Sequence, residues 1–275
     1  MASDEALGRK ADALRTAMQE RGELLVALSG GVDSGLVCRL AVQALGSGAL
    51  AVTARSESLP DREFRAARRV AGEVGIRHRI VRYSELANPN YAKNPINRCY
   101  FCRQDLGRAL RPVAEEEGIE TIADGVLASD LGAWRPGIRA MDEAGFWHPL
   151  VDAGMDKGQV RGMARELGLS FHAKPSMACL SSRIPYGQAV TTDRLDRIER
   201  AEGVLYDLGF QEVRVRHLGH VARVEVAKAE VARLQEPPTR DRVSQALLDL
   251  GFTAIEVDPK GYRTGSLDEA LTPPG

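Results

Sequence analysis

The stretch LLVALSGGVDS, residues 24–34, constrains the fold of this chain more than any other. Five apolar residues in a row, 24–28, fit a strand buried on both faces of a parallel sheet, and apolar residues recur at helical intervals over 35–45. The glycines between them lie where the carboxyl end of a strand meets a helix N-terminus. Free N–H groups and the helix dipole favour an anion there, and Gly30 and Gly31 let a phosphate approach the backbone. The stretch therefore predicts a strand–turn–helix unit that binds phosphate.

This turn differs from the two most familiar nucleotide-binding loops. No lysine follows the glycines, so the pattern G-x-x-x-x-G-K-[ST] is absent, and so is G-x-G-x-x-G. Residues 29–34 instead resemble the SGGxDS loop of the N-type ATP pyrophosphatases, which include GMP, NAD, asparagine and argininosuccinate synthetases and tRNA thiolases. The resemblance implies a loop that holds the β,γ-diphosphate of ATP, formed here by Ser29, Gly30, Gly31, Asp33 and Ser34. A plain glycine turn is the alternative.

Strand and helix patterns alternate up to about residue 170. We expect strands at 49–54, 79–83 and 121–125, and helices at 6–21, 61–72, 104–117 and 157–167. This order predicts an α/β fold with a doubly wound parallel sheet, of the PP-loop (adenine nucleotide alpha hydrolase-like) type. Ligands of such sheets lie outside the carboxyl ends of the strands. Thr53 and Ala54 end the second strand, where the resemblance implies contact with adenine.

The pattern changes after residue 185. Helices are expected at 193–208 and 239–250, and strands at 211–217, 222–226 and 253–257. The near copies LYDLGF (205–210) and LLDLGF (247–252) each predict a helix end capped by glycine before a strand. We therefore expect two domains, a PP-loop domain at 1–185 and a small α+β domain at 186–275.

Composition limits the classes of partner. The 37 basic residues nearly cancel 38 acidic ones, so the net charge of −1 gives no general attraction to nucleic acid. The N-terminus lacks the features of a signal peptide, and no apolar stretch approaches membrane-spanning length. We expect a cytoplasmic protein without a membrane or nucleic-acid partner. In a reducing compartment, its four cysteines indicate metal or redox chemistry rather than disulfides.

Three of the cysteines are candidates for chemistry. Cys99 and Cys102 form a C-x-x-C pair, which fits a zinc half-site, a redox pair or accidental spacing equally well. Cys179 lies in a loop whose other polar or cationic residues favour a lowered thiol pKa; they are Lys174, Ser181, Ser182 and Arg183. Cys38 falls on the core side of the first helix, where cysteine behaves as a small apolar residue.

The loop SMACLSSRIPYG, residues 176–187, makes the resemblance more specific. Together with the SGGVDS loop and the segment 135–137, it resembles the LarE family over nearly the whole chain. Members are ATP-dependent sulfur transferases of nickel-pincer nucleotide synthesis. The resemblance implies a pyridinium-3,5-biscarboxylic acid mononucleotide substrate, whose carboxylates are adenylated with ATP and Mg²⁺ and converted to thiocarboxylates, with Cys179, Asp33 and Ser34 as catalytic residues. It also implies a trimer-based homo-oligomer, by analogy alone.

The family has two forms. One gives up the sulfur of its loop cysteine, and the other has three cysteines that bind a [4Fe-4S] cluster, which passes on a sulfide from a sulfur donor. Cys99, Cys102 and Cys179 favour the cluster form here, because three thiolates leave one iron open.

Other site residues follow the fourth strand or lie in the second domain. The resemblance assigns Gly125 to a nucleotide loop, Asp130 to Mg²⁺ and Arg135 to diphosphate. Arg214 and Arg216 alternate along one strand and so face one side, where guanidinium groups can hold phosphate. The resemblance places an anion site there, to which we also assign Arg183, with Glu202 and Glu225 nearby. A solvated strand face is the alternative.

Three rival functions remain open: a tRNA thiolase, an amidotransferase-like pyrophosphatase such as an NAD synthetase, and a nucleotide sensor or iron–sulfur scaffold without turnover. A tRNA thiolase must hold a polyanion, which the nearly neutral charge disfavours. An NAD-synthetase-like enzyme needs no cysteines, and a sensor would release no diphosphate.

Overall fold

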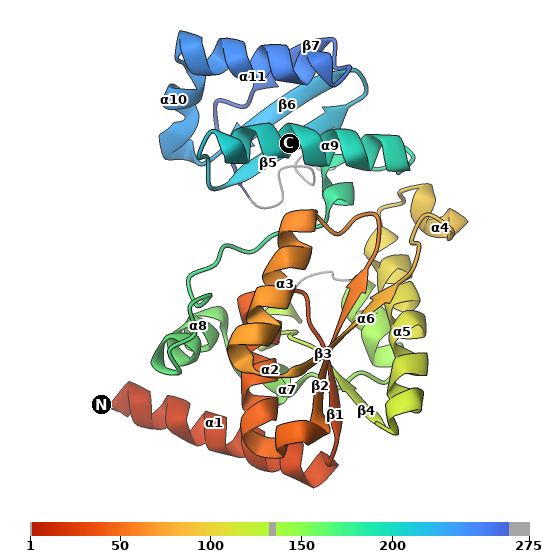
Figure 1. Ribbon diagram of the computed structural model, residues 1–275, viewed down its shortest axis with the longest axis vertical. Coiled ribbons are helices and arrows are strands. Elements are labelled where there is room, and N and C mark those ends of the chain that lie inside the picture. The colour runs from red at the N-terminus through yellow and green to blue at the C-terminus, as the bar shows by residue number, and fades with distance from the viewer. Residues whose placement is uncertain (1, 132–135, 264–275) are drawn as a thin grey trace, which may run out of the picture. The chain divides into compact units, whose positions relative to one another are not determined.

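The computed structural model describes residues 2–131 and 136–263, and the chain forms two compact units (Figure 1). Unit 1 contains residues 1–88 and 97–177, and unit 2 contains residues 89–96 and 178–275. The short segment 89–96 thus packs with unit 2, although the residues on either side of it belong to unit 1. None of the helices in the described part of the chain is both long and apolar enough to cross a lipid bilayer.

Unit 1 is built on a parallel sheet in the order β3-β2-β1-β4. The strands are β1 (Leu24–Ala27), β2 (Ala49–Arg55), β3 (Arg77–Arg82) and β4 (Thr121–Ala123). In the central pairings, Val26 of β1 lies opposite Ala51 of β2 and Ala123 of β4. The predicted parallel α/β fold is confirmed.

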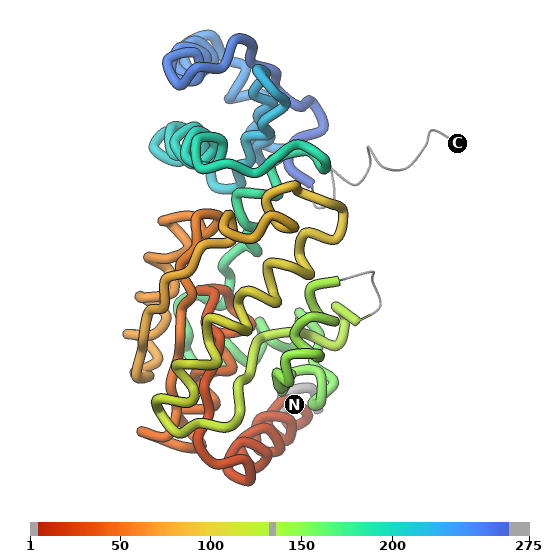
Figure 2. The backbone as a smooth tube through the Cα atoms, turned by 90° about the vertical axis from the view of Figure 1, so that its right-hand side faces the viewer, coloured from red at the N-terminus to blue at the C-terminus, as the bar shows by residue number. Residues whose placement is uncertain are grey.

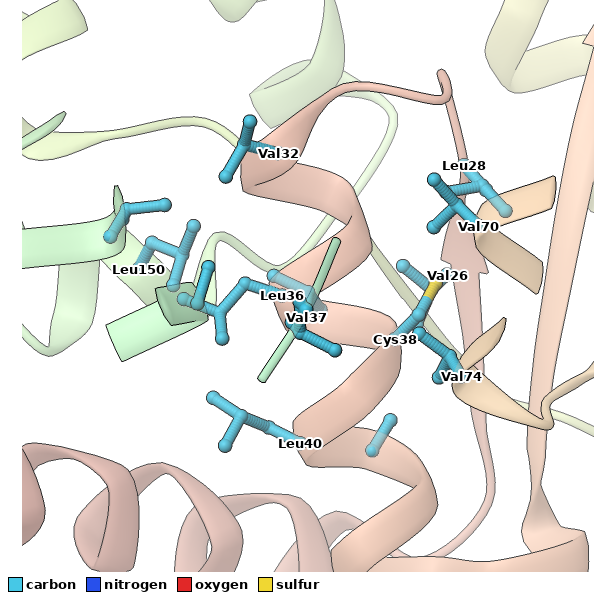
Figure 3. Packing of buried hydrophobic residues seen from close by; sticks show 14 of the residues in the cluster. Val26, Leu28, Val32, Leu36, Val37, Cys38, Leu40, Val70, Val74 and Leu150 are labelled. Atoms are coloured by element: carbon cyan, nitrogen blue, oxygen red, sulfur yellow. The ribbon is translucent and has the colours of Figure 1, made fainter. Parts of the chain in front are cut away.

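Helices cover both faces of this sheet. They are α1 (Ala2–Arg21), α2 (Val32–Leu45), α3 (Asp61–Val74), α5 (Arg98–Glu117), α6 (Pro136–Glu143), α7 (Pro149–Asp152) and α8 (Lys157–Glu166), with 3-10 turns η1 (Gly46–Gly48) and η2 (Ala128–Asp130). Leu24 and Val26 pack with α1, α2, α3 and α8, whereas Leu25 packs with α5 and α6. This division follows from the alternation of side chains along a strand. Figure 3 shows α2 residues Leu36 and Cys38 within the first of these cores.

One helix boundary differs from the prediction. The helix expected at 104–117 begins at Arg98, so Cys99 and Cys102 lie in its first turns rather than in the preceding loop. The residue at its N-cap, Asn97, makes no side-chain capping hydrogen bond. The sequence prediction was wrong here because no capping side chain marks the helix start.

Unit 2 has a three-stranded sheet in the order β5-β6-β7. The strands are β5 (Val213–Leu218), β6 (Val221–Val226) and β7 (Ala254–Val257); β5 and β6 are antiparallel, and β6 and β7 are parallel. The helices are α4 (Pro89–Ala92), α9 (Thr192–Asp207), α10 (Val231–Gln235) and α11 (Pro237–Asp249), with 3-10 turns η3 (Leu180–Arg183) and η4 (Lys228–Glu230). Helices α9 and α11 lie on one face of this sheet (Figure 2), and their apolar residues form a core with those of the strands. Gly209 and Gly251 both have positive φ just after their helices, which confirms the two glycine-capped ends.

Candidate active site

The glycine turn between β1 and α2 can be formed only by glycine at position 30. Gly30 has a φ of +80°, and a Cβ there would lie 2.7 Å from the backbone nitrogen of Ala67. Gly31, the N-cap of α2, is extended and provides no capping side chain. Helix geometry leaves the N–H groups of the first turn, residues 32–34, without intrahelical partners. The turn therefore offers backbone donors to an anion.

The two serines of the turn contact each other. Their hydroxyl oxygens are 3.0 Å apart, Ser29 N–H donates to Ser34 Oγ at 3.2 Å, and Gly31 N–H donates to Ser29 Oγ at 3.3 Å. These bonds close the turn on itself and hold both hydroxyls beside the first turn of α2.

Asp33 presents one satisfied and one unsatisfied carboxylate oxygen. Its Oδ2 lies 3.3 Å from Lys157 Nζ, whereas its buried Oδ1 has no hydrogen-bond partner among the described residues. A buried acceptor without a donor is unfavourable, and carboxylate oxygens are preferred ligands of Mg²⁺. The environment of Asp33 thus fits a bound Mg²⁺.

Lys174 holds the outer side of the glycine turn. Its Nζ donates to the carbonyl of Gly30 at 2.7 Å and forms an ion pair with Glu63 Oε2 at 2.6 Å. Arg161 in turn donates to the Lys174 carbonyl at 2.7 Å. The sequence interpretation had grouped Lys174 with Cys179, but its ammonium is bound to groups at the turn. Sequence reasoning missed the roles of Glu63 and Lys157 here, because nothing in the local pattern links residues more than 100 positions apart.

The ends of the neighbouring strands complete this part of the site. A Cβ at Gly125 would lie 2.5 Å from the backbone nitrogen of Ser34, so only glycine lets the exit of β4 touch the first turn of α2. Thr53, buried at the end of β2, donates its hydroxyl to the Leu28 carbonyl at 2.9 Å. Next to it, Ala54 lies on the same strand, partly exposed. Predicted residues from β1, β2 and β4 thus meet at the carboxyl edge of the sheet.

The loop after β4 is described only in part. Asp130 Oδ2 accepts the N–H of Leu127 at 3.1 Å within η2. Arg135, predicted to reach the diphosphate, lies outside the described residues.

His148 holds the exit of β4 by its side chain. Its Nδ1 is 2.7 Å from Asp124 Oδ1, and its Nε2 is 3.0 Å from Asp142 Oδ1. Burial opposes protonation of this ring, but the two carboxylates outweigh it and hold the pKa of His148 above its usual value. Because Asp124 precedes Gly125, the histidine braces the segment that contacts α2.

The C-x-x-C cysteines occupy the beginning of α5. Cys99 is exposed, and Cys102, partly buried, donates its thiol to Glu85 Oε1 at 2.8 Å. Glu85 is 1% exposed and also accepts hydrogen bonds from Ser56 and Ser58. Cys38 is fully buried and its pKa is raised by burial, so its predicted place in the core is confirmed.

The Cys179 loop belongs to unit 2 and is organised by Arg183. The guanidinium is fully buried and pairs with Glu202 through two hydrogen bonds, at 2.7 and 3.0 Å. Its Nη1 also donates to the carbonyls of Ala178 and Cys179. Burial disfavours the charge of Arg183, but Glu202 outweighs this effect and raises its pKa. Arg183 therefore fixes the backbone that carries the thiol, and its charge is balanced within the protein.

Arg214 and Arg216 lie on the face of β5 opposite the helices, and they are 7% and 3% exposed. The alternative of a solvated strand face is therefore wrong. Arg216 pairs with Glu225 through two hydrogen bonds, at 2.9 and 3.0 Å. Arg214 donates to Tyr262 Oη at 2.8 Å and, within the described ranges, forms no ion pair with a carboxylate. Burial lowers its pKa. A buried cation without a counter-charge favours binding of an anion.

No three His, Cys, Asp or Glu side chains of residues 2–131 and 136–263 form a group that could hold a metal ion. Cys99 and Cys102 lie in unit 1 and Cys179 lies in unit 2. Ligation of one cluster by all three thus stays a prediction.

Comparison with known proteins shows which families and enzymes this chain resembles. A family model described as asparagine synthase matches residues 9–96, which include the glycine turn. An uncharacterized protein of Synechocystis sp. is 40% identical over 97% of this chain and 99% of that protein. The pyridinium-3,5-bisthiocarboxylic acid mononucleotide synthase of Lactiplantibacillus plantarum is 34% identical over 97% of this chain and 96% of that enzyme. A tRNA-specific 2-thiouridylase of Caulobacter sp. is 29% identical over 71% of this chain and 57% of that enzyme.

Proposed function

We propose that this chain, which belongs to the LarE family of ATP-dependent sulfurtransferases, acts on a pyridinium mononucleotide. It converts the carboxylates of pyridinium-3,5-biscarboxylic acid mononucleotide to thiocarboxylates. The observation that carries this proposal is the 34% identity to a synthase of the bisthiocarboxylic product over nearly the whole of both chains. The glycine turn and the buried Arg214 are the structural features that support it.

The first step is activation of a carboxylate. A substrate carboxylate oxygen attacks the α-phosphorus of ATP, the bond to the β-phosphate oxygen breaks, and diphosphate leaves toward the N–H groups at the start of α2. Asp33 would hold the Mg²⁺ that neutralises charge on the diphosphate. The product is an acyl adenylate, whose carbonyl carbon a sulfur nucleophile can attack.

The substrate also carries a phosphate, which needs a cationic site. Arg216 and Arg183 are already paired with Glu225 and Glu202, so their main role is to shape the surface. Arg214 forms no ion pair with a carboxylate of the described residues, and its guanidinium can fork onto phosphate oxygens. We assign the substrate phosphate to Arg214.

Sulfur attack expels AMP and forms the new carbon–sulfur bond. Cys179 can supply this sulfur itself: its thiolate forms a thioester, and loss of the Cα proton with cleavage of the Cβ–S bond then leaves a thiocarboxylate and dehydroalanine. The presence of Cys99 and Cys102 favours a [4Fe-4S] cluster held by all three thiolates, which would supply a labile sulfide from a sulfur donor. Thiolates of three cysteines are donors that such a cluster takes.

One anaerobic preparation tests the proposal. We expect diphosphate release that requires the pyridinium substrate, a thiocarboxylate product by mass spectrometry, and iron and sulfide with broad absorption near about 400 nm that is lost in Cys99→Ala. If the protein is colourless and its Cys179 becomes dehydroalanine during turnover, the sulfur comes from Cys179 itself and not from a cluster. Absence of substrate-dependent diphosphate release, or tight and salt-sensitive tRNA binding, would overturn the proposed substrate.

A further inference from the structure

Residues 89–96 form a clip on the loop that carries Cys179, with the side chains of Tyr91 and Asn94 buried. Asn94 is fully buried and has a φ of +56°, which makes it the one non-glycine residue with positive φ in the part of the chain that the structure describes. Asparagine tolerates this left-handed conformation better than most residues, but the conformation is still strained. Strain of this kind persists where surrounding contacts demand it.

Those contacts are hydrogen bonds to the backbone that follows η3. Asn94 Nδ2 lies 2.8–3.2 Å from the carbonyl oxygens of Ile184, Pro185 and Gln188. Its own carbonyl accepts the N–H of Gly187 at 2.9 Å. The amide thus supplies hydrogen-bond donors to residues 184–188, which form neither a helix nor a strand.

The same segment reaches the other side of Arg183. Tyr91 is almost fully buried, and its hydroxyl lies 2.6 Å from Ser181 Oγ, two residues beyond Cys179. Arg183, between these two attachment points, donates to the carbonyl of Cys179 at 3.0 Å. The clip and the guanidinium together leave the backbone from 178 to 188 little conformational freedom.

We propose that Tyr91 and Asn94 are positioning residues that fix the loop in the conformation presenting the Cys179 thiol. This inference rests on the proposed function, in which Cys179 handles sulfur. The loop contains a 3-10 turn between prolines, and Arg183 holds the backbone on the Cys179 side of it. We expect that loss of the clip lets the loop populate further conformations. The rate of sulfur transfer then falls in proportion to the fraction of molecules in the productive conformation.

Two substitutions each delete side-chain hydrogen bonds of the clip and change few other atoms. Asn94→Gly keeps the left-handed backbone but deletes the amide, and Tyr91→Phe deletes only the hydroxyl. Lys93→Ala is the matched control, because Lys93 lies on the same segment and is exposed. The first readout is the rate of Cys179 alkylation by iodoacetamide as a function of pH, mapped by peptide mass spectrometry. The second readout is steady-state kinetics, in which kcat and the KM for ATP are determined separately.

We expect Asn94→Gly and Tyr91→Phe to change the Cys179 alkylation rate and to lower kcat by about tenfold, with KM for ATP near that of the parent protein. Asn94→Gly should also lower the melting temperature, because it deletes buried hydrogen bonds. Unchanged alkylation and unchanged kcat in both variants would overturn the proposal. Alkylation needs no turnover, so it tests the clip even if the parent protein proves inactive on the pyridinium substrate. Should Asn94→Gly fail to fold, Tyr91→Phe decides the outcome.

Discussion

Lys174 Nζ lies 2.6 Å from Glu63 Oε2, and the same ammonium donates to the carbonyl of the glycine turn. The pair is mostly buried, with side chains 19% and 9% exposed. It joins the segment after α8 to α3 and to the turn that is expected to bind diphosphate. A single cation therefore stabilises both the local fold and the geometry of the candidate site.

Lys174→Met should destabilise the protein by about 3 kcal/mol and weaken ATP binding, because it leaves the carboxylate of Glu63 buried without a counter-charge. Urea unfolding and calorimetric titration with ATP measure the two effects. The double variant Lys174→Met, Glu63→Gln should recover much of the stability, since the unpaired charge is gone. Equal stability of the single and double variants would show that the pair is not coupled.

Gly30→Ala should abolish ATP binding and lower the melting temperature, because Ala would need both a left-handed backbone and a 2.7 Å approach to Ala67 N. Gly75→Ala is the matched control. Gly75 also has a positive φ, but it lies at the end of α3, and a Cβ there would meet no atom within 4 Å. Similar ATP affinity for both variants would contradict this account of the turn.

Arg214→Met and Arg216→Met should separate binding from stability. Arg216→Met removes the guanidinium that pairs with the buried carboxylate of Glu225, so we expect a loss of about 3–5 kcal/mol in unfolding free energy. Arg214→Met removes a cation without a carboxylate partner, so stability should change little while KM for the pyridinium mononucleotide rises by about tenfold or more. Chemical denaturation and steady-state kinetics distinguish the two. If Arg214→Met keeps the parent KM for the pyridinium mononucleotide, the substrate phosphate binds at another site.

Stability of unit 2 should fall in mild acid because of His217. Its ring is buried, neither nitrogen has a hydrogen-bond partner within residues 2–131 and 136–263, and burial together with Arg194 lowers the pKa of His217. The folded state therefore resists protonation: the stability is complete above the ordinary histidine pKa of about 6.5 and decreases as pH falls below it. Denaturant unfolding between pH 5 and 8 measures the slope, which His217→Leu should reduce. If the unfolding free energy of His217→Leu depends on pH as steeply as that of the parent protein, other groups cause the acid sensitivity.

Periodicity and short motifs predicted the parallel sheet, the glycine turn and the two glycine-capped helix ends, because each depends on neighbouring residues along the chain. The start of α5 was missed since Asn97 offers no capping bond, so the sequence left Cys99 and Cys102 in a loop. Such errors are local and small.

The sequence by itself determined which residues can bind a diphosphate, carry a reactive thiol or hold an anion. Only the tertiary structure decided which charges remain available: it paired Arg183 with Glu202 and Arg216 with Glu225, and it left Arg214 without a carboxylate among the described residues. It also attached Lys174 to the glycine turn and Asn94 to the Cys179 loop. The physical reason is that ion pairs and hydrogen bonds between distant positions depend on how elements pack, which no local pattern encodes.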